Sequence, residues 1–372
     1  MNRARLVQKI RHALCRQPLA NDTRGAVAVT VAIMLVVLLS FAALALDISN
    51  AMIARNELQN VADASALAGA RQLGVIYAAL PTGTPYTTYT YSSPGVVEAA
   101  VTAVASANPA REVASISINP GDIRIGVWNS APRTLTPGNV GATGVEVTAR
   151  RDAGANGPVA TWLAGVMGIN SMSVVATATA ALTGAGVLPP AGANAPFAFD
   201  QKFFTDPAFC NKPIQFYPTT TSCASFQTFD LTPSNANTMG NIIDGLAANP
   251  PTYTSPQITA NQTSLEFIGG NVASAFPNLI NLFNAKKVPD ASSPSGFCWN
   301  VTIPVYSNPS NLTCGNPSGS LLITGFASAC VSNVTGPPTQ QIFATVTCGQ
   351  VTGGTGGGGA FGVLGAIPGL VK

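Results

Sequence analysis

Residues 26–46 read AVAVTVAIMLVVLLSFAALAL and form a run of 21 positions without a charged side chain. A helix needs about 20 apolar residues to cross the hydrocarbon core of a bilayer, which is ~30 Å thick. A helix also bonds its backbone groups internally, and this makes such a segment tolerable in lipid. The sequence therefore predicts a transmembrane helix over residues 25–46.

A cleaved signal peptide is the alternative interpretation of this segment. The residues Ala-Leu-Ala at 43–45 form an acceptable cleavage site with small residues at its two ends. The apolar region of a signal peptide is normally about 7–15 residues long, which is shorter than the run found here. The length favours an uncleaved anchor, and cleavage near Ala45 stays open.

The charges near the span predict its orientation. Basic side chains crowd the segment before it, at Arg3, Arg5, Lys9, Arg11, Arg16 and Arg24. Only Asp22 opposes them there, and the formal net charge of the whole chain is only +3. Basic residues stay on the cytoplasmic side. We expect a cytoplasmic tail at 1–24 and a C-terminal region on the outer side of the membrane, and we expect no nucleic-acid partner.

The stretch after the span continues the helical pattern as an amphipathic extension over residues 47–75. At 100° per residue, one side collects Ile48, Ala51, Arg55, Leu58, Ala62, Ala66, Gly69 and Leu73. Apart from Arg55, this side is largely small, so another backbone can approach it closely. Two interpretations are open: an interaction face for a partner, made of Ile48, Ala51, Leu58, Ala62, Ala66, Gly69 and Leu73, or a core face of the exported region.

The remaining pattern predicts an α+β fold, with a mixed membrane-proximal region at 76–187. Helical patterns cover 96–108 and, after Pro158, a short apolar segment to Gly168 that is too short to cross a membrane. Alternation with period two predicts strands, which are 114–119, 122–129, 144–150 and 171–182.

A Pro- and Gly-containing linker at 188–196 precedes a β-rich distal domain at 197–352. Its expected strands are 299–307, 320–331 and 341–348, and its expected helix, 270–285, contains Pro277 and should be broken or kinked. The Gly-rich tail at 353–372 is either a docked or a loose segment.

Cysteine usage agrees with export. Cys15 precedes the span, whereas the others follow it, at Cys210, Cys223, Cys298, Cys314, Cys330 and Cys348. An even set in an oxidising compartment predicts disulfides. The simplest expectation pairs sequence neighbours, which gives 210–223, 298–314 and 330–348. A zinc site is not expected, because no CxxC pair is present.

The residues offer little for catalysis. The only histidine, His12, lies before the span, so the exported region lacks an imidazole for a catalytic triad or a metal site. Nucleotide-binding glycine motifs are also absent. We therefore expect a protein that is not an enzyme, has no cofactor or small-molecule substrate, and works through contacts.

The N-terminal pattern resembles a known family. Residues 24–70 combine Arg24-Gly25, the span, Asp47, Leu58-Gln59 and an Ala/Asp-rich run from Ala62 to Ala70. This combination resembles the TadE/TadG-like proteins of tight-adherence (Flp) pilus assembly. Residues 144–182, and more weakly 323–348, are similar to later regions of TadG-type proteins.

The resemblance implies a membrane-anchored structural component of pilus assembly, with partners among other assembly membrane proteins or further copies of itself. It also implies a bacterial inner-membrane protein whose C-terminal region is periplasmic or on the surface. Pseudopilins of this system are cleaved after a Gly that a Glu follows five residues later. Here Thr30 occupies that position after Gly25, so we expect no cleavage there. Residues 290–294, DASSP, depart from the DxSxS metal motif of von Willebrand-type adhesion domains. The alternative function is a surface adhesin or envelope-binding protein with the same single-pass anchor.

Overall fold

The structure is a computed structural model that describes residues 23–372, except 82, 217–222, 270–271, 310–313 and 315–316. Most of the expected cytoplasmic tail, including His12 and Cys15, lies outside the described residues. The helices are α2 (Thr23–Ala78), α3 (Val96–Ser106), α4 (Ala236–Ala247) and α5 (Phe276–Lys286). The short 3-10 turns are η1 (Tyr86–Thr88), η2 (Pro120–Asp122), η3 (Ala164–Met167), η4 (Gln201–Thr205) and η5 (Ala273–Ala275).

The first half of the chain contains strands β1 (Ile123–Asn129), β2 (Thr134–Pro137), β3 (Gly144–Arg151), β4 (Val159–Ala160), β5 (Ser171–Met172), β6 (Val174–Ala181) and β7 (Val187–Leu188). The second half contains β8 (Phe197–Asp200), β9 (Pro213–Phe216), β10 (Ala224–Phe226), β11 (Ile258–Thr259), β12 (Ser264–Phe267), β13 (Val288–Pro289), β14 (Phe297–Tyr306), β15 (Gly319–Thr335), β16 (Gln341–Thr347), β17 (Gln350–Thr355), β18 (Val363–Ile367) and β19 (Gly369–Leu370). The expected α+β class is confirmed: a long N-terminal helix precedes a mixed region and then a β-rich region that holds the cysteine pairs.

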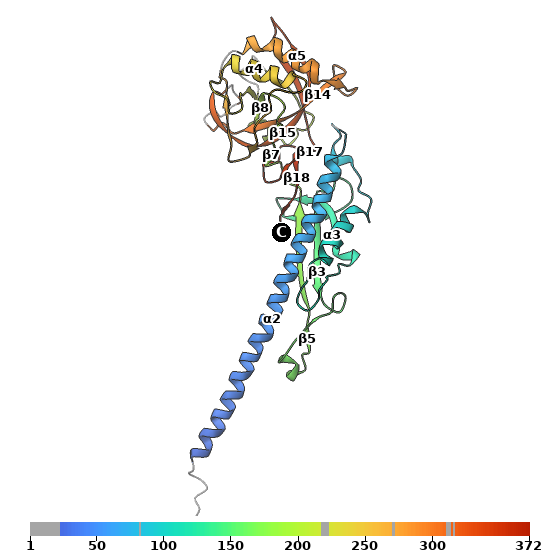
Figure 1. Ribbon diagram of the computed structural model, residues 1–372, viewed down its shortest axis with the longest axis vertical. Coiled ribbons are helices and arrows are strands. Elements are labelled where there is room, and N and C mark those ends of the chain that lie inside the picture. Colours follow the sequence, from blue (N-terminus) through green and yellow to red (C-terminus); the bar gives the residue numbers. More distant parts are fainter. Residues whose placement is uncertain (1–22, 82, 217–222, 270–271, 310–313, 315–316) are drawn as a thin grey trace, which may run out of the picture. The chain divides into compact units, whose positions relative to one another are not determined.

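Helix α2 runs without interruption through both the apolar segment and the amphipathic extension (Figure 1). Its sequence is rich in Ala, Leu and Val and has no proline before Pro81, which follows its end. Proline disfavours helical geometry in the residue before it, so Pro81 bars the helix from continuing. The helix contributes to two compact units: one holds residues up to Asn56 with Arg151–Val174, and the other holds Glu57–Arg150 with Val175–Lys372.

A five-stranded sheet in the second unit has the order β19-β6-β3-β1-β2. Strands β1 and β3 are antiparallel, with Ile125 opposite Val145, and match the strands expected at 122–129 and 144–150. The strand expected at 114–119 is wrong, because this segment joins no ladder. Its Ile116 and Ile118 are nevertheless buried, so the alternation marked packing rather than strand pairing.

Helix α3 matches the helix expected at 96–108 and has a defined start. Glu98 Oε2 accepts a hydrogen bond from the Gly95 backbone N–H at 2.9 Å, and Glu98 also accepts one from the Tyr91 hydroxyl at 2.6 Å. A carboxylate at the third helical position that reaches back in this way satisfies a backbone donor that the helix leaves unpaired.

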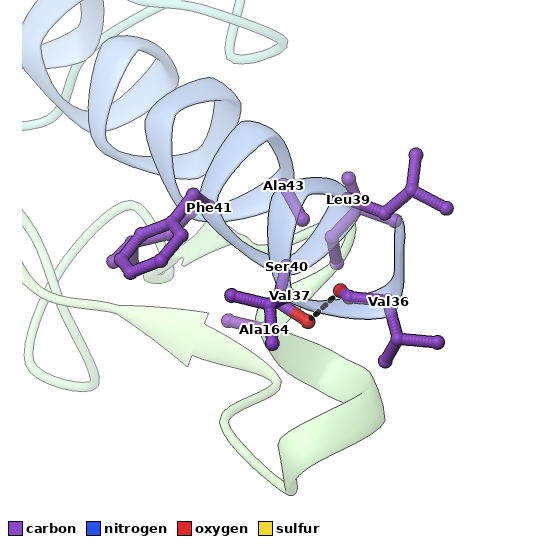
Figure 2. A pocket seen from close by; sticks show the side chains of 9 residues that line it. Val36, Val37, Leu39, Ser40, Phe41, Ala43 and Ala164 are labelled. Carbon is purple, nitrogen blue, oxygen red and sulfur yellow. Dashed lines mark hydrogen bonds between the residues drawn. The ribbon is translucent and has the colours of Figure 1, made fainter. Parts of the chain in front are cut away.

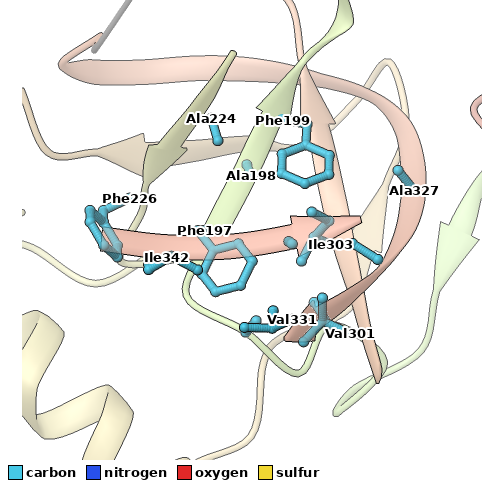
Figure 3. Packing of buried hydrophobic residues seen from close by; sticks show 14 of the residues in the cluster. Phe197, Ala198, Phe199, Ala224, Phe226, Val301, Ile303, Ala327, Val331 and Ile342 are labelled. Atoms are coloured by element: carbon cyan, nitrogen blue, oxygen red, sulfur yellow. The ribbon is translucent and has the colours of Figure 1, made fainter. Parts of the chain in front are cut away.

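The core of the β-rich region lies on an eight-stranded sheet in which β14 and β15 are central neighbours. Their antiparallel register places Val301 opposite Ala329. Figure 3 shows Phe197 and Phe199 of β8 among aliphatic side chains of the neighbouring strands. The strands expected at 299–307, 320–331 and 341–348 are therefore confirmed as β14, β15 and β16.

Two expected helices differ in the structure. The helix expected from Pro158 to Gly168 is wrong, since only the single turn η3 forms there, between the short paired strands β4 and β5. Gly168 follows η3 with φ of +86°, a left-handed conformation that ends the turn and that glycine adopts without strain. Pro277 does not kink α5 but lies in its first turn, where the missing N–H costs no hydrogen bond.

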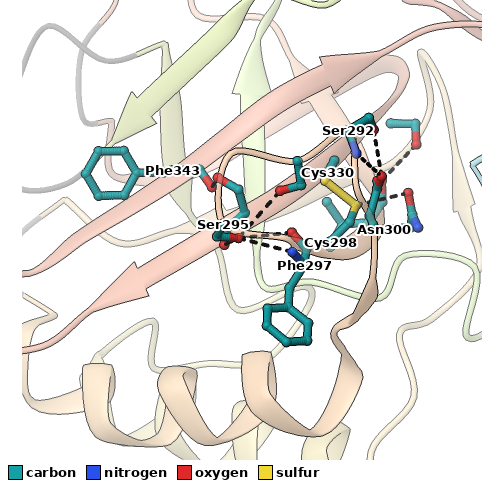
Figure 4. The surroundings of a disulfide bond; sticks show 12 residues. Ser292, Ser295, Phe297, Cys298, Asn300, Cys330 and Phe343 are labelled. Atoms are coloured by element: carbon teal, nitrogen blue, oxygen red, sulfur yellow. Dashed lines mark hydrogen bonds between the residues drawn. A yellow bond between two sulfur atoms is a disulfide. The ribbon is translucent and has the colours of Figure 1, made fainter.

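The expected disulfide pairing is wrong, although all six cysteines pair. The bonds join Cys210 to Cys348, Cys223 to Cys314, and Cys298 to Cys330. Sheet register explains two of them. Strand β9 pairs with β16, which places Cys210 beside Cys348, and β14 pairs with β15, which places Cys298 beside Cys330 (Figure 4). Strand pairing between distant segments, and not closeness in sequence, therefore selects the partners.

The Gly-rich tail is docked. Strand β17 pairs in parallel with β18, and β19 pairs with β6 at the edge of the five-stranded sheet. The backbone N–H of Thr179 also donates to the carbonyl of Lys372 at 2.8 Å.

Candidate membrane-boundary site

The first half of α2 is long and apolar enough to cross a membrane. Within the described residues it is the one helix that meets this criterion, and none of its most apolar window is buried inside the fold. Large side chains from Val27 to Leu46 are about half to two-thirds exposed, for example Leu38 at 68% and Phe41 at 68%. Such a largely exposed apolar surface is typical of a helix that contacts lipid.

The second half of α2 is instead a core helix. Five residues of the predicted interaction face, Leu58, Ala62, Ala66, Gly69 and Leu73, are buried. A Cβ added at Gly69 would lie 2.7 Å from Val101 Cγ2 of α3 and 3.1 Å from Val145 Cγ1 of β3. From Leu58 onward the small residues therefore admit the chain's own helix and sheet, which is the core alternative.

The remaining two residues of that predicted face lie before this buried stretch. Ile48 is 43% exposed and Ala51 is half-buried. Arg55, which the angle count put on the same face, is exposed, while its neighbour Ala54 is fully buried. The buried stripe thus begins at Ala54, later than the start of the predicted face at Ile48, and Ala54 takes the place that the angle count gave to Arg55.

Asp47 marks the boundary between the uncharged segment and the rest of α2. Its carboxylate is buried, with 3% exposure of the residue, and accepts three backbone hydrogen bonds. The donors are the N–H groups of Trp162 at 2.7 Å, Leu163 at 3.1 Å and Ala164 at 2.6 Å, which lead into η3. The Asp47 side chain thus binds the backbone of the tip of the β4–β5 hairpin and fixes the tip against α2.

The hydrogen bonds lower the pKa of the Asp47 carboxyl from its ordinary value of 3.8. The bond from Trp162 contributes most, and the one from Ala164 comes next, while burial opposes them. Hydrogen bonds to the charged form favour ionisation. Asp47 is therefore an anion whose charge is held by backbone dipoles.

A second contact fixes the same hairpin. The Asn50 side chain, one turn after Asp47, donates to the carbonyl of Ala160 at 3.3 Å. The sequence analysis did not predict a contact between Asp47 and this hairpin. Two features of the sequence point to these segments separately: Asp47 follows an uncharged span directly, and residues 153–199 carry no charge. Neither feature indicates that the two segments meet.

An apolar groove lies between α2 and η3 (Figure 2). Its volume is about 530 Å³, and Leu163 and Ala164 form one wall. The other wall is made by α2 residues between Val36 and Leu44, which are Val36, Val37, Leu39, Ser40, Phe41, Ala43 and Leu44. Ser40 is the one hydroxyl in the lining, and its Oγ donates to the Val36 carbonyl at 2.8 Å. The groove offers no charged or catalytic group, so its chemistry suits hydrocarbon.

A cluster of Asp290, Cys298 and Cys330 brings three atoms that can ligate a metal together among the described residues, one carboxylate oxygen and two sulfurs. Both sulfurs belong to one disulfide, so neither is a thiolate that could bind a metal. Asp290 Oδ1 accepts hydrogen bonds from the backbone and hydroxyl of Ser292, at 2.9 and 2.6 Å. This geometry makes DASSP a hydrogen-bonded turn next to a disulfide.

Comparison with known proteins identifies the N-terminal segment. Residues 25–72 match the family model described as a putative Flp pilus-assembly TadE/G-like domain. The match covers the apolar span, Asp47 and most of the buried half of α2. No curated protein and no solved structure shows a significant match to the chain.

Proposed function

We propose that this chain, whose N-terminal segment matches the TadE/G-like family model, is a membrane-anchored structural component of Flp-type pilus assembly that acts through protein–protein contacts. The observation that carries the proposal is the family match over 25–72, which coincides with an exposed apolar helix and its continuation. The family supports the role in pilus assembly, and the contact mechanism is our inference.

The proposed contact surface lies just after Asp47. Ile48, Met52 and Ile53 are 43%, 63% and 45% exposed. Ile48 and Met52 are four residues apart and so share one side of the helix. An exposed apolar strip beside a membrane span suits a neighbouring membrane helix, from another assembly protein or from a second copy.

The placement in the envelope is part of the proposal. Basic residues before the span support a cytoplasmic N-terminus in the inner membrane. Three disulfides in the region after the span support an oxidising periplasmic or surface environment. We propose no catalytic role, and this is supported by the position of the sole histidine, His12, before the span.

A photo-crosslinking amino acid at Met52 in pilus-forming cells tests the proposal. We expect an adduct with another pilus-assembly membrane protein or with a second copy of the chain. Val96 of α3 is a matched control, because it is also an exposed apolar helical residue, at 55%, and should give no such adduct.

Two results together would overturn the proposal. Cells that lack the chain would still form pili, and the crosslinker at Met52 would capture no membrane protein. Binding to external surfaces with no assembly partner would instead support the adhesin alternative.

A further inference from the structure

The tip of the β4–β5 hairpin is apolar and exposed. Trp162, Leu163 and Ile169 are 65%, 39% and 52% exposed, although each is a side chain that water disfavours. No charged residue occurs between Asp152 and Asp200, so no charged side chain in this hairpin opposes its insertion into lipid. An exposed apolar tip of this kind needs a partner.

The tip lies beside the part of α2 that carries the lipid-facing surface. Leu163 and Ala164 line one groove with α2 side chains from Val36 to Leu44. These α2 residues precede Asp47 by three to eleven positions, which corresponds to roughly 5–16 Å along a helix with a rise of 1.5 Å per residue. If residues 36–44 of α2 lie in the hydrocarbon core, then Leu163 and Ala164, which face them across the groove, lie at the same depth in the membrane.

Several backbone N–H groups of the tip are hydrogen-bonded, which lowers the cost of placing them in lipid. Unpaired N–H groups are costly in lipid. Asp47 accepts the N–H groups of Trp162, Leu163 and Ala164, while Gly168 N–H donates to Gly165 and Ile169 N–H donates to Ala164, at 3.0 and 3.1 Å. The same bonds shelter the Asp47 charge, which would otherwise be costly at the membrane boundary.

We propose that residues 161–169 form a second membrane-contacting element, which inserts into the outer leaflet beside the transmembrane helix without crossing the bilayer, and that lipid acyl chains occupy the groove. Trp162 contacts Asp47 through its backbone and so lies at the interfacial level, where tryptophan side chains are enriched. The inference rests on the membrane anchoring in the proposed function and adds a second point of attachment to it.

Quenching of tryptophan fluorescence by brominated lipid tests the insertion. The full chain is placed in nanodiscs at one copy per disc, with bromine near the headgroup end of the acyl chains, and is compared with its Trp162→Phe variant. Trp128→Phe is the matched control. We expect bromolipid to remove most of the Trp162 emission, so that the quenchable component is lost in Trp162→Phe and kept in Trp128→Phe.

Two outcomes separate this inference from the anchoring itself. If alkaline carbonate extracts the full chain from membranes, the anchoring in the proposed function is wrong. If the chain resists extraction but wild type and Trp162→Phe are quenched equally, the anchor stands and the insertion of the tip is overturned. Crosslinking of Leu163→Cys to a second copy, without quenching in single-copy discs, would assign the tip to a protein partner and also overturn the proposal.

Discussion

The two halves of helix α2 belong to one continuous helix but differ in composition and have opposite surroundings. Residues before Asp47 are Ala-, Val- and Leu-rich and exposed, whereas Leu58 to Leu73 present Ala, Gly and Leu to the chain's own core. The packing differs as well: α3 and β3 cover the second half, whereas among the described residues the apolar tip of one hairpin approaches the first. One continuous helix therefore has two environments, and the presence or absence of charged side chains in the sequence already distinguishes them.

The largest expected effect comes from filling the tight face of the second half. Ala62→Trp with Gly69→Trp adds large side chains where a single Cβ at position 69 already comes within 2.7 Å of Val101. Overpacking of even modest size costs about 1–3 kcal/mol, so we expect this pair to abolish the folded exported region. Limited proteolysis of the membrane-bound protein measures it.

The control for this pair is Val29→Trp in the first half, where the native side chain is 60% exposed. It should leave protease resistance unchanged. Retention of the folded region in the double variant would show that the face from Ala62 to Gly69 is open to partners rather than packed.

A smaller effect is expected from a cavity at Leu58, which is fully buried. Leu58→Ala should lower the free energy of unfolding by about 2–5 kcal/mol, the usual range for a buried leucine. Leu38→Ala, at a position that is 68% exposed, should change it little. Thermal melts in detergent followed by circular dichroism compare the two, and equal losses would contradict the division of the helix at this point.

The smallest effect is expected at the boundary, where Asp47→Asn should loosen only the hairpin tip. The variant loses the charge that three backbone N–H groups share. Hydrogen exchange should then become faster at Trp162, Leu163 and Ala164, while amides of the five-stranded sheet keep their protection. Exchange that rises throughout the protein would assign Asp47 a wider structural role.

The same bonds predict a pH dependence. Because the folded state lowers the pKa of Asp47 below 3.8, the ionised carboxylate contributes stability above that value. The contribution is lost as the pH falls through the lower, folded-state pKa. Protection factors at the three amides should therefore be constant between neutral pH and about pH 5, and should drop below about pH 4 in the wild type but not in Asp47→Asn.

Local patterns in the sequence were enough to predict the span, α3 and the long strands β14, β15 and β16. Each of these depends on hydrophobic periodicity within one segment, which a sequence displays directly. Ile116 and Ile118 show the limit of that signal, because alternation reports burial and says nothing about a partner strand. The disulfide pairs and the bond between Asp47 and the hairpin tip depend on segments far apart in the chain, so no local pattern could indicate them.

The position of strand β19 near the end of the chain determines when the five-stranded sheet can be completed. The N-terminal anchor emerges first, yet one edge of the sheet that carries β3 and β6 is closed by residues 369–370. The whole cysteine-containing region must therefore be synthesised before that sheet has all its strands. During this interval β6 is an unpaired edge, which is a site for non-native pairing with another chain. A chain that stalls at this stage would keep this edge exposed to chaperones and proteases.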